Sequence, residues 1–144
     1  MILALYEYMD GQLLERQNAM FNDASLKVSQ QWDLACDYLD DDLASGYVRV
    51  LHELTAAGWS SPDIGRVVSD GLLGWQGLLA QVARRAQQTF GAIGPFEPED
   101  IAALVGSAFI GAEAFLLLGL EDKHVPLRRA FRRFGGVIRL AEDQ

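Results

Sequence analysis

The longest apolar stretch of the chain lies between residues 98 and 120. Glu113 is the one charged residue between Asp100 and Glu121, and no proline interrupts the run. Pro98 suits the first position of a helix. A helix that is apolar on every side must be covered on every side. The cover is either a bilayer, which about 20 apolar residues can cross, or other protein. Because acids rather than basic residues flank the stretch, we expect a soluble helix with one face on its own core and another on a partner.

Five further segments carry apolar residues three and four positions apart, as amphipathic helices do. They cover residues 2–21, 25–40, 43–57, 62–90 and 126–141. Pro62, Pro98 and Pro126 stand at expected helix starts. The pattern therefore predicts one all-α domain of six helices over residues 1–144, with the last two helices joined as a hairpin.

The same pattern assigns faces to the polar residues. The inward stripe of the first segment is Ile2, Tyr6, Met9 and Leu13, which places Asp10 outside. Asp40, Asp41 and Asp42 are expected at a junction, where acids favour the start of the next helix, and Gly58 is expected to cap that helix. The arginines of residues 126–141 lie opposite its apolar stripe. We expect them to form a solvated face, with a nucleic-acid or membrane patch as the alternative.

Composition narrows the class of protein. The net charge of −8 and the pI near 4.6 argue against a nucleic-acid surface, which needs clustered Lys and Arg. The single cysteine, Cys36, excludes an intrachain disulfide and fits a reducing compartment. The N-terminal residues lack the basic start of a signal peptide. These observations predict a cytoplasmic protein.

No residue set typical of catalysis or of a metal site stands out. His52 is expected to point away from the apolar stripe of its helix, and His124 lies in a turn. Cys36 is expected to be an inert buried thiol. Neither a catalytic triad nor a metal set follows from these positions. We therefore expect no enzyme activity, no cofactor and no metal.

Residues on the inward stripes suggest a cavity between helices. Gly71 and Gly74 remove side-chain volume beside Trp75. Glu113 is costly in an apolar helix unless it has a partner; an arginine partner and a place in a ligand cavity both stay open. The candidate ligand-binding residues are Trp32, Cys36, Tyr47, Leu54, Trp75, Leu79, Phe109 and Glu113.

The end of the chain resembles TetR/AcrR-type transcriptional regulators. The resemblance rests on residues 109–119, on 126–130 and on Ile138 with Arg139, while residues 3–7 resemble the start of the helix that connects the two domains of that family. It implies a regulatory domain that homodimerises through its last two helices and senses a small apolar or aromatic effector. Small residues in the central stretch favour the same contact. The expected interface residues are Leu104, Ala108, Gly111, Phe115, Phe131, Phe134 and Ile138.

One departure from the family concerns DNA. Its members carry a helix-turn-helix domain before the connecting helix, and no stretch here offers a short helix, a tight turn and a basic recognition helix. DNA binding is therefore expected only through an N-terminal domain missing from this chain. The alternative function is a truncated interaction module that dimerises with full-length relatives without sensing a ligand.

Overall fold

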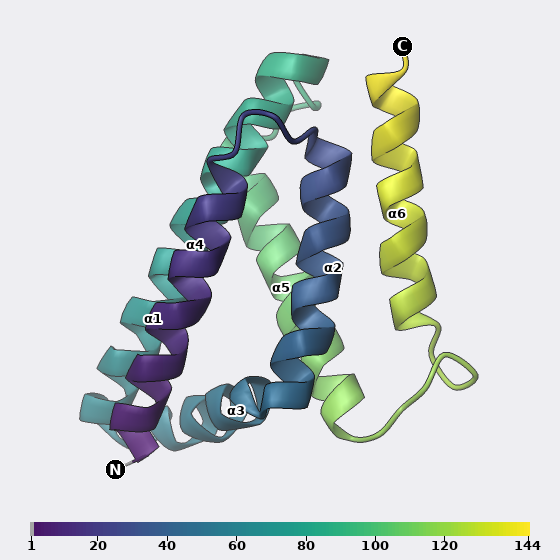
Figure 1. Cartoon of the computed structure of the whole chain (residues 1–144). Coiled ribbons are helices and arrows are strands. Elements are labelled where there is room, and N and C mark those ends of the chain that lie inside the picture. The colour runs from purple at the N-terminus through teal and green to yellow at the C-terminus, as the bar shows by residue number, and fades with distance from the viewer. Residues whose placement is uncertain (1) are drawn as a thin grey trace.

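The computed structural model describes residues 2–144, and every regular element in that range is an α-helix (Figure 1). The all-α class and the number of helices predicted from the hydrophobic pattern are thereby confirmed. The six helices are α1 (Ile2–Phe21), α2 (Val28–Ser45), α3 (Tyr47–Gly58), α4 (Pro62–Phe90), α5 (Pro98–Leu117) and α6 (Leu127–Glu142).

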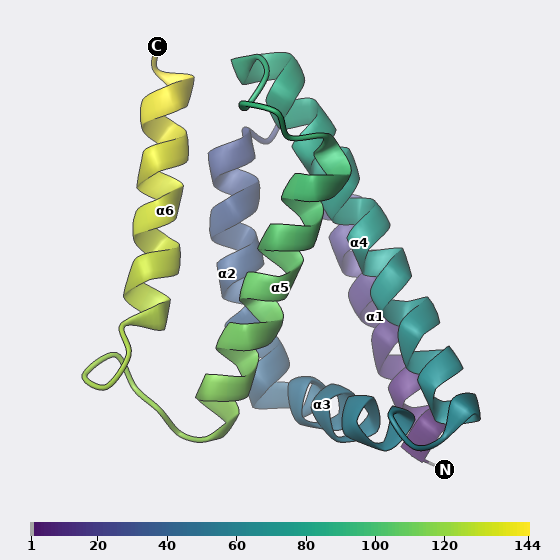
Figure 2. The same ribbon diagram turned by 180° about the vertical axis from the view of Figure 1, so that it is seen from behind.

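The helices frame a wedge-shaped domain. Helices α1 and α4 lie side by side along one edge, and the short α3 crosses the base (Figure 1). Helix α5 packs extensively on α4, and α2 lies between the α1–α4 edge and α6 (Figure 2). Two clusters of buried side chains fill the space between α1 and its neighbours. One, with α3 and α4, contains Tyr6, Tyr47, Val48, Leu51, Leu54 and Val68, and the other contains Met20, Phe21 and Leu78.

The junctions around α3 differ from the expectation. Helix α2 continues through the three aspartates to Ser45, and the chain turns at Gly46, whose φ of 88° is one that glycine adopts most readily. Gly58 ends α3 as a helical residue rather than as its cap. Its role is close packing, because a Cβ added there would lie 2.9 Å from the Cα of Gly65 in α4.

Helix α6 packs mainly against α2 rather than returning along α5. The indole N–H of Trp32 donates to the main-chain oxygen of Phe131 at 2.7 Å. Three of the arginines expected on a solvated face are instead partly exposed partners of α2 carboxylates. These ion pairs are Arg128 with Asp40, Arg132 with Asp37 and Arg139 with Asp33.

Helix α5 is only partly covered. Within residues 2–144 it is the one helix long and apolar enough to cross a membrane, judged by length and composition alone. Only 28% of its apolar window is buried. Leu104 is 60% exposed and Phe115 is 44% exposed. One face of α5 is therefore left bare by the rest of the described chain.

Candidate functional site

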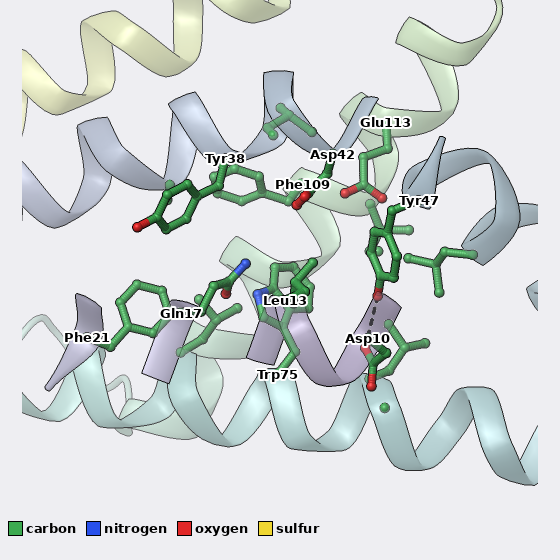
Figure 3. Close-up of a pocket in the computed structure, with 17 residues that line it drawn as sticks. Asp10, Leu13, Gln17, Phe21, Tyr38, Asp42, Tyr47, Trp75, Phe109 and Glu113 are labelled. Carbon is green, nitrogen blue, oxygen red and sulfur yellow. Dashed lines mark hydrogen bonds between the residues drawn. The ribbon is translucent and has the colours of Figure 1, made fainter. Parts of the chain in front are cut away.

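Two adjoining cavities lie between the helices. The larger, here called the apolar chamber, has a volume of about 320 Å³ and lies between α2, α4, α5 and α6. The smaller, here called the acidic cavity, has a volume of about 50 Å³ and lies deeper, against α1 and α3 (Figure 3). Phe21, Ala35, Leu79 and Phe109 line both spaces. A single ligand could therefore contact the walls of both.

Most of the predicted ligand-binding residues meet here. Tyr47, Trp75, Leu79, Phe109 and Glu113 line the acidic cavity. Trp32 lines the chamber together with Leu79 and Phe109, and its ring lies 5.5 Å from that of Phe109. The structure does not bring the other two predicted residues to either space. Cys36 borders a separate crevice beneath α6, and Leu54 is buried in the cluster of α1, α3 and α4.

The glycines expected to create the gap do not do so. Gly71 borders the acidic cavity, but a Cβ there would press on the Tyr6 hydroxyl and lie 2.9 Å from Asp10 Oδ2. Gly74 is exposed, and a Cβ there would make an ordinary 3.4 Å contact with Leu14. The chamber is lined instead by small side chains from four helices. They are Ala35 of α2, Ala83 and Ala86 of α4, Ala102 of α5 and Ala141 of α6.

Asp10 is buried, which corrects its expected outward position. The hydroxyl of Tyr47 donates to Asp10 Oδ1 at 2.9 Å, and the ring of Tyr47 stacks on that of Tyr6. Burial raises the pKa of Asp10, although the Tyr47 hydrogen bond opposes the rise. Burial, followed by the Asp10 charge, raises the pKa of Tyr6 to about 12. None of the ion pairs within residues 2–144 includes Asp10.

Glu113 has a partner and also lines the cavity. It is 8% exposed, and its Oε1 lies 2.9 Å from Nε2 of His52. The partner is thus a histidine of α3 rather than an arginine, and His52 turns toward α5 instead of away from the core. Burial raises the pKa of Glu113, and the hydrogen bond and charge of His52 act against that rise.

The third carboxylate of the cavity is Asp42. Both of its oxygens accept hydrogen bonds from Arg16 Nη2, at 3.1 and 3.0 Å. The Arg16 guanidinium also lies 4.0 Å from the ring centre of Tyr38, a favourable cation–π distance. Burial raises the pKa of Asp42, and Arg16 opposes the rise. Asp42 and Arg16 therefore tie α2 to α1 at the cavity wall.

Cys36 is buried, as expected of an inert thiol. Burial raises its pKa to about 11, so the thiolate needed for nucleophilic attack is scarce at neutral pH. Within residues 2–144 no group of three His, Cys, Asp or Glu side chains is arranged to hold a metal ion. The chemistry that this arrangement offers is recognition: apolar walls beside a few buried polar groups, as in small-molecule sites.

The expected interface residues divide into two sets. Leu104, Ala108, Gly111 and Phe115 lie exposed on one face of α5, and Phe134 is exposed on α6. Phe131 and Ile138 instead face inward. The ring of Phe131 lies 4.9 Å from that of Phe109, and Ile138 lines the apolar chamber. Val137 and Leu140, which the sequence reasoning did not select, are the exposed apolar residues of α6 beside Phe134.

Comparison with protein-family models, with characterised proteins and with solved structures found no match for this chain.

Proposed function

We propose that this chain is a non-enzymatic, homodimeric sensor domain of the TetR type, which binds a small apolar or aromatic effector in the cytoplasm. The observation that carries the proposal is the position of α5 and α6. Both helices line the apolar chamber, and both also expose apolar side chains: Leu104 and Phe115 on α5, and Phe134 and Val137 on α6. A ligand in the chamber and a partner on the bare face would therefore act on the same two helices.

The exposed stripe of α5 favours a second copy of the chain as the partner. Leu104, Ala108, Gly111 and Phe115 follow one another at intervals of four, three and four residues, a spacing typical of packed helix pairs. Their sizes run large, small, small, large. Under a two-fold axis with antiparallel α5 helices, Leu104 faces Phe115 of the partner and Ala108 faces Gly111 of the partner. The stripe is thus complementary to itself, as a two-fold interface requires.

Helix α6 extends the same face. Leu104, Ala108, Ala130 and Phe134 line an open apolar groove between α5 and α6. Phe134 also lines the apolar chamber. Its side chain is therefore the direct physical link between a bound effector and the proposed dimer contact. A ligand that moved Phe134 would shift the equilibrium between two dimer arrangements, provided that it binds one of them better.

The size and lining of the chamber support an effector of the proposed kind. A volume of about 320 Å³ falls at the lower end of the range for small-molecule sites, roughly 300 to 1,000 Å³. Aromatic and aliphatic side chains from four helices make up almost all of its wall. Such a wall favours binding of a ligand with a large apolar surface and offers it few hydrogen bonds.

The test of sensing is a thermal-shift screen of apolar and aromatic compounds, read alongside Trp32 fluorescence. A compound at a hundredfold excess over its Kd should stabilise the fold by about 2.7 kcal/mol. Ala86→Phe places a ring in the chamber and should abolish the shift. The matched control, Ala19→Phe on the exposed side of α1, should retain it. If no compound stabilises the parent chain while the dimer forms, sensing is excluded and the interaction-module function takes its place.

A further inference from the structure

The chemical class of the effector can be narrowed from the charges around the acidic cavity. Three carboxylates line it: Asp10 from α1, Asp42 from α2 and Glu113 from α5. The cations beside them are Arg16, bound to Asp42, and His52, bound to Glu113. Helix α4 adds the neutral Trp75 and α3 the neutral Tyr47. Carboxyl groups therefore outnumber basic side chains around the cavity, and Asp10 has no ion-pair partner among residues 2–144.

A second, independent feature points to a missing hydrogen-bond donor. Gln17 lines the cavity and is 7% exposed, and its Oε1 has no hydrogen-bond partner. In Figure 3 Gln17 and Trp75 lie on one side of the space, and Asp42 and Glu113 lie on the other. An unpaired buried acceptor costs free energy that a donor placed in the cavity would recover.

The two cavities differ in what they can hold. The acidic cavity, at about 50 Å³, exceeds the roughly 10–15 Å³ that one water molecule needs and has room for a small polar group such as an ammonium. The apolar chamber, at about 320 Å³, has room for a bicyclic aromatic body. The side chains that belong to both walls are Phe21, Ala35, Leu79 and Phe109, and a ligand reaching from one space to the other would have to displace or pass them.

We propose that the two cavities form one site for an organic cation, with an apolar body in the chamber and a protonated amine between Gln17, Asp10 and Glu113. This inference rests on the proposed sensing function and specifies its ligand. The amine N–H groups would satisfy Gln17 Oε1 and the carboxylate oxygens left open by Tyr47 and His52. Because burial raises the pKa values of Asp10 and Glu113, binding of a cation would also release protons from them.

The experiment compares 2-(1-naphthyl)ethylamine with 2-(1-naphthyl)ethanol by isothermal titration calorimetry. The two probes share the same body and differ in the charged group. The amine should bind the parent chain at least about tenfold more tightly than the alcohol, since hydrogen bonds to charged groups are the stronger ones. Titrations in buffers of different ionisation enthalpy should reveal more proton release with the amine than with the alcohol.

Three variants locate the amine. Glu113→Gln and Asp10→Asn keep the shape of each side chain and remove its charge, so each should lower the affinity for the amine more than the affinity for the alcohol. Glu15→Gln removes an exposed carboxylate of α1 and should leave the preference intact. The helical circular dichroism signal and the urea midpoint serve as the folding control for each variant.

Each other outcome overturns the inference. If the parent chain binds both probes equally, the cation is excluded while apolar sensing stands. If the amine preference survives in both Glu113→Gln and Asp10→Asn, the amine lies elsewhere and the assigned site is wrong. If neither probe binds, the inference fails, and the thermal-shift screen decides separately whether the proposed sensing function stands.

Discussion

Nε2 of His52 lies 2.9 Å from Oε1 of Glu113, and this contact joins α3 to α5 at the wall of the acidic cavity. His52→Ala would leave a buried carboxylate without its partner, which costs about 1–3 kcal/mol of unfolding free energy. The loss should be larger at pH 8 than at pH 5, because a protonated Glu113 tolerates burial better than a charged one. Urea unfolding of the parent chain and of His52→Ala at both pH values measures this loss of unfolding free energy. The double variant His52→Ala/Glu113→Gln should recover part of the loss at pH 8; no recovery would mean that only packing was lost.

Asp10 provides a second pH prediction. Its pKa is raised in the folded chain by burial, so the folded state holds a proton that the unfolded state releases near its ordinary pKa of about 3.9. Stability from this group is therefore complete below that pH and is lost as the pH rises through the folded pKa. Asp10→Asn should be more stable than the parent at pH 8, with the difference vanishing toward pH 3.5. A variant less stable than the parent at pH 8 would contradict this.

The attachment of α6 to α2 can be divided between aromatic packing and ion pairs. Trp32→Ala removes a partly buried ring that contacts Phe109, Phe131 and Phe134 and should cost about 3 kcal/mol. Arg132→Gln breaks an exposed pair with Asp37 and should cost at most about 1 kcal/mol. Chemical denaturation measures both costs, and hydrogen exchange of α6 amides shows whether α6 detaches first. A larger loss of unfolding free energy for Arg132→Gln than for Trp32→Ala would show that ion pairs, and not aromatic packing, hold α6 on α2.

The proposed dimer is tested by Gly111→Arg. A Cβ at Gly111 meets no atom within 4 Å in the protomer, so the variant should fold normally. It would place a charged side chain opposite Ala108 of the partner and should convert a dimer into a folded monomer. Analytical ultracentrifugation at micromolar concentration distinguishes the two. A parent chain that sediments as a monomer would exclude the dimer at once.

The antiparallel pairing of α5 has its own test. Chains carrying Ala108→Cys should form a disulfide with chains carrying Gly111→Cys when the two are mixed and oxidised, because these positions face each other across the proposed axis. Either variant alone should cross-link far less. Cys36 is buried and should not interfere. Efficient cross-linking of each variant with itself would place the helices parallel instead.

Much of the fold could be predicted from hydrophobic spacing. Helices α1 and α4 begin and end at the predicted residues, and Pro62 and Pro98 open their helices as expected. The α2–α3 junction was missed because three consecutive aspartates look like a helix start. The stronger signal was Gly46, where the chain adopts a positive φ. Local charge preference is weak beside the continuous apolar stripe that carries α2 to Ser45.

The candidate site was harder to predict because its polar residues occupy apolar positions of their helices. Asp10 and Gln17 continue the Tyr6 and Leu13 stripe at intervals of three and four residues, and both are buried. A stripe assigned from residue type alone places such polar residues on the outer face of the helix. Their partners, Tyr47 for Asp10 and none for Gln17, depend on how three helices meet. That geometry is not contained in the spacing of any one of them.

The inner face of α6 could not be predicted from the spacing of its own residues either. Phe131 was assigned to a partner contact because it lies on an apolar stripe of an end helix. In the structure Trp32 and Phe109 occupy that side of it. Which apolar face meets the protomer and which stays bare depends on the choice of α2 as the neighbour of α6. Aromatic packing around Trp32 and the ion pairs of the two helices act together in this choice, and no single-helix pattern reveals it.

The three ion pairs between α2 and α6 also determine how far α6 can slide. Asp33, Asp37 and Asp40 meet Arg139, Arg132 and Arg128 in antiparallel order. A slide of one turn in one direction would set Gly136 against Asp37 and Asp143 against Asp33, and the opposite slide would set Gly135 against Asp33. Each pair adds little stability because it is exposed, yet only one register satisfies all three. The ladder thus selects the axial position of α6, and with it the position of the apolar face that α6 presents.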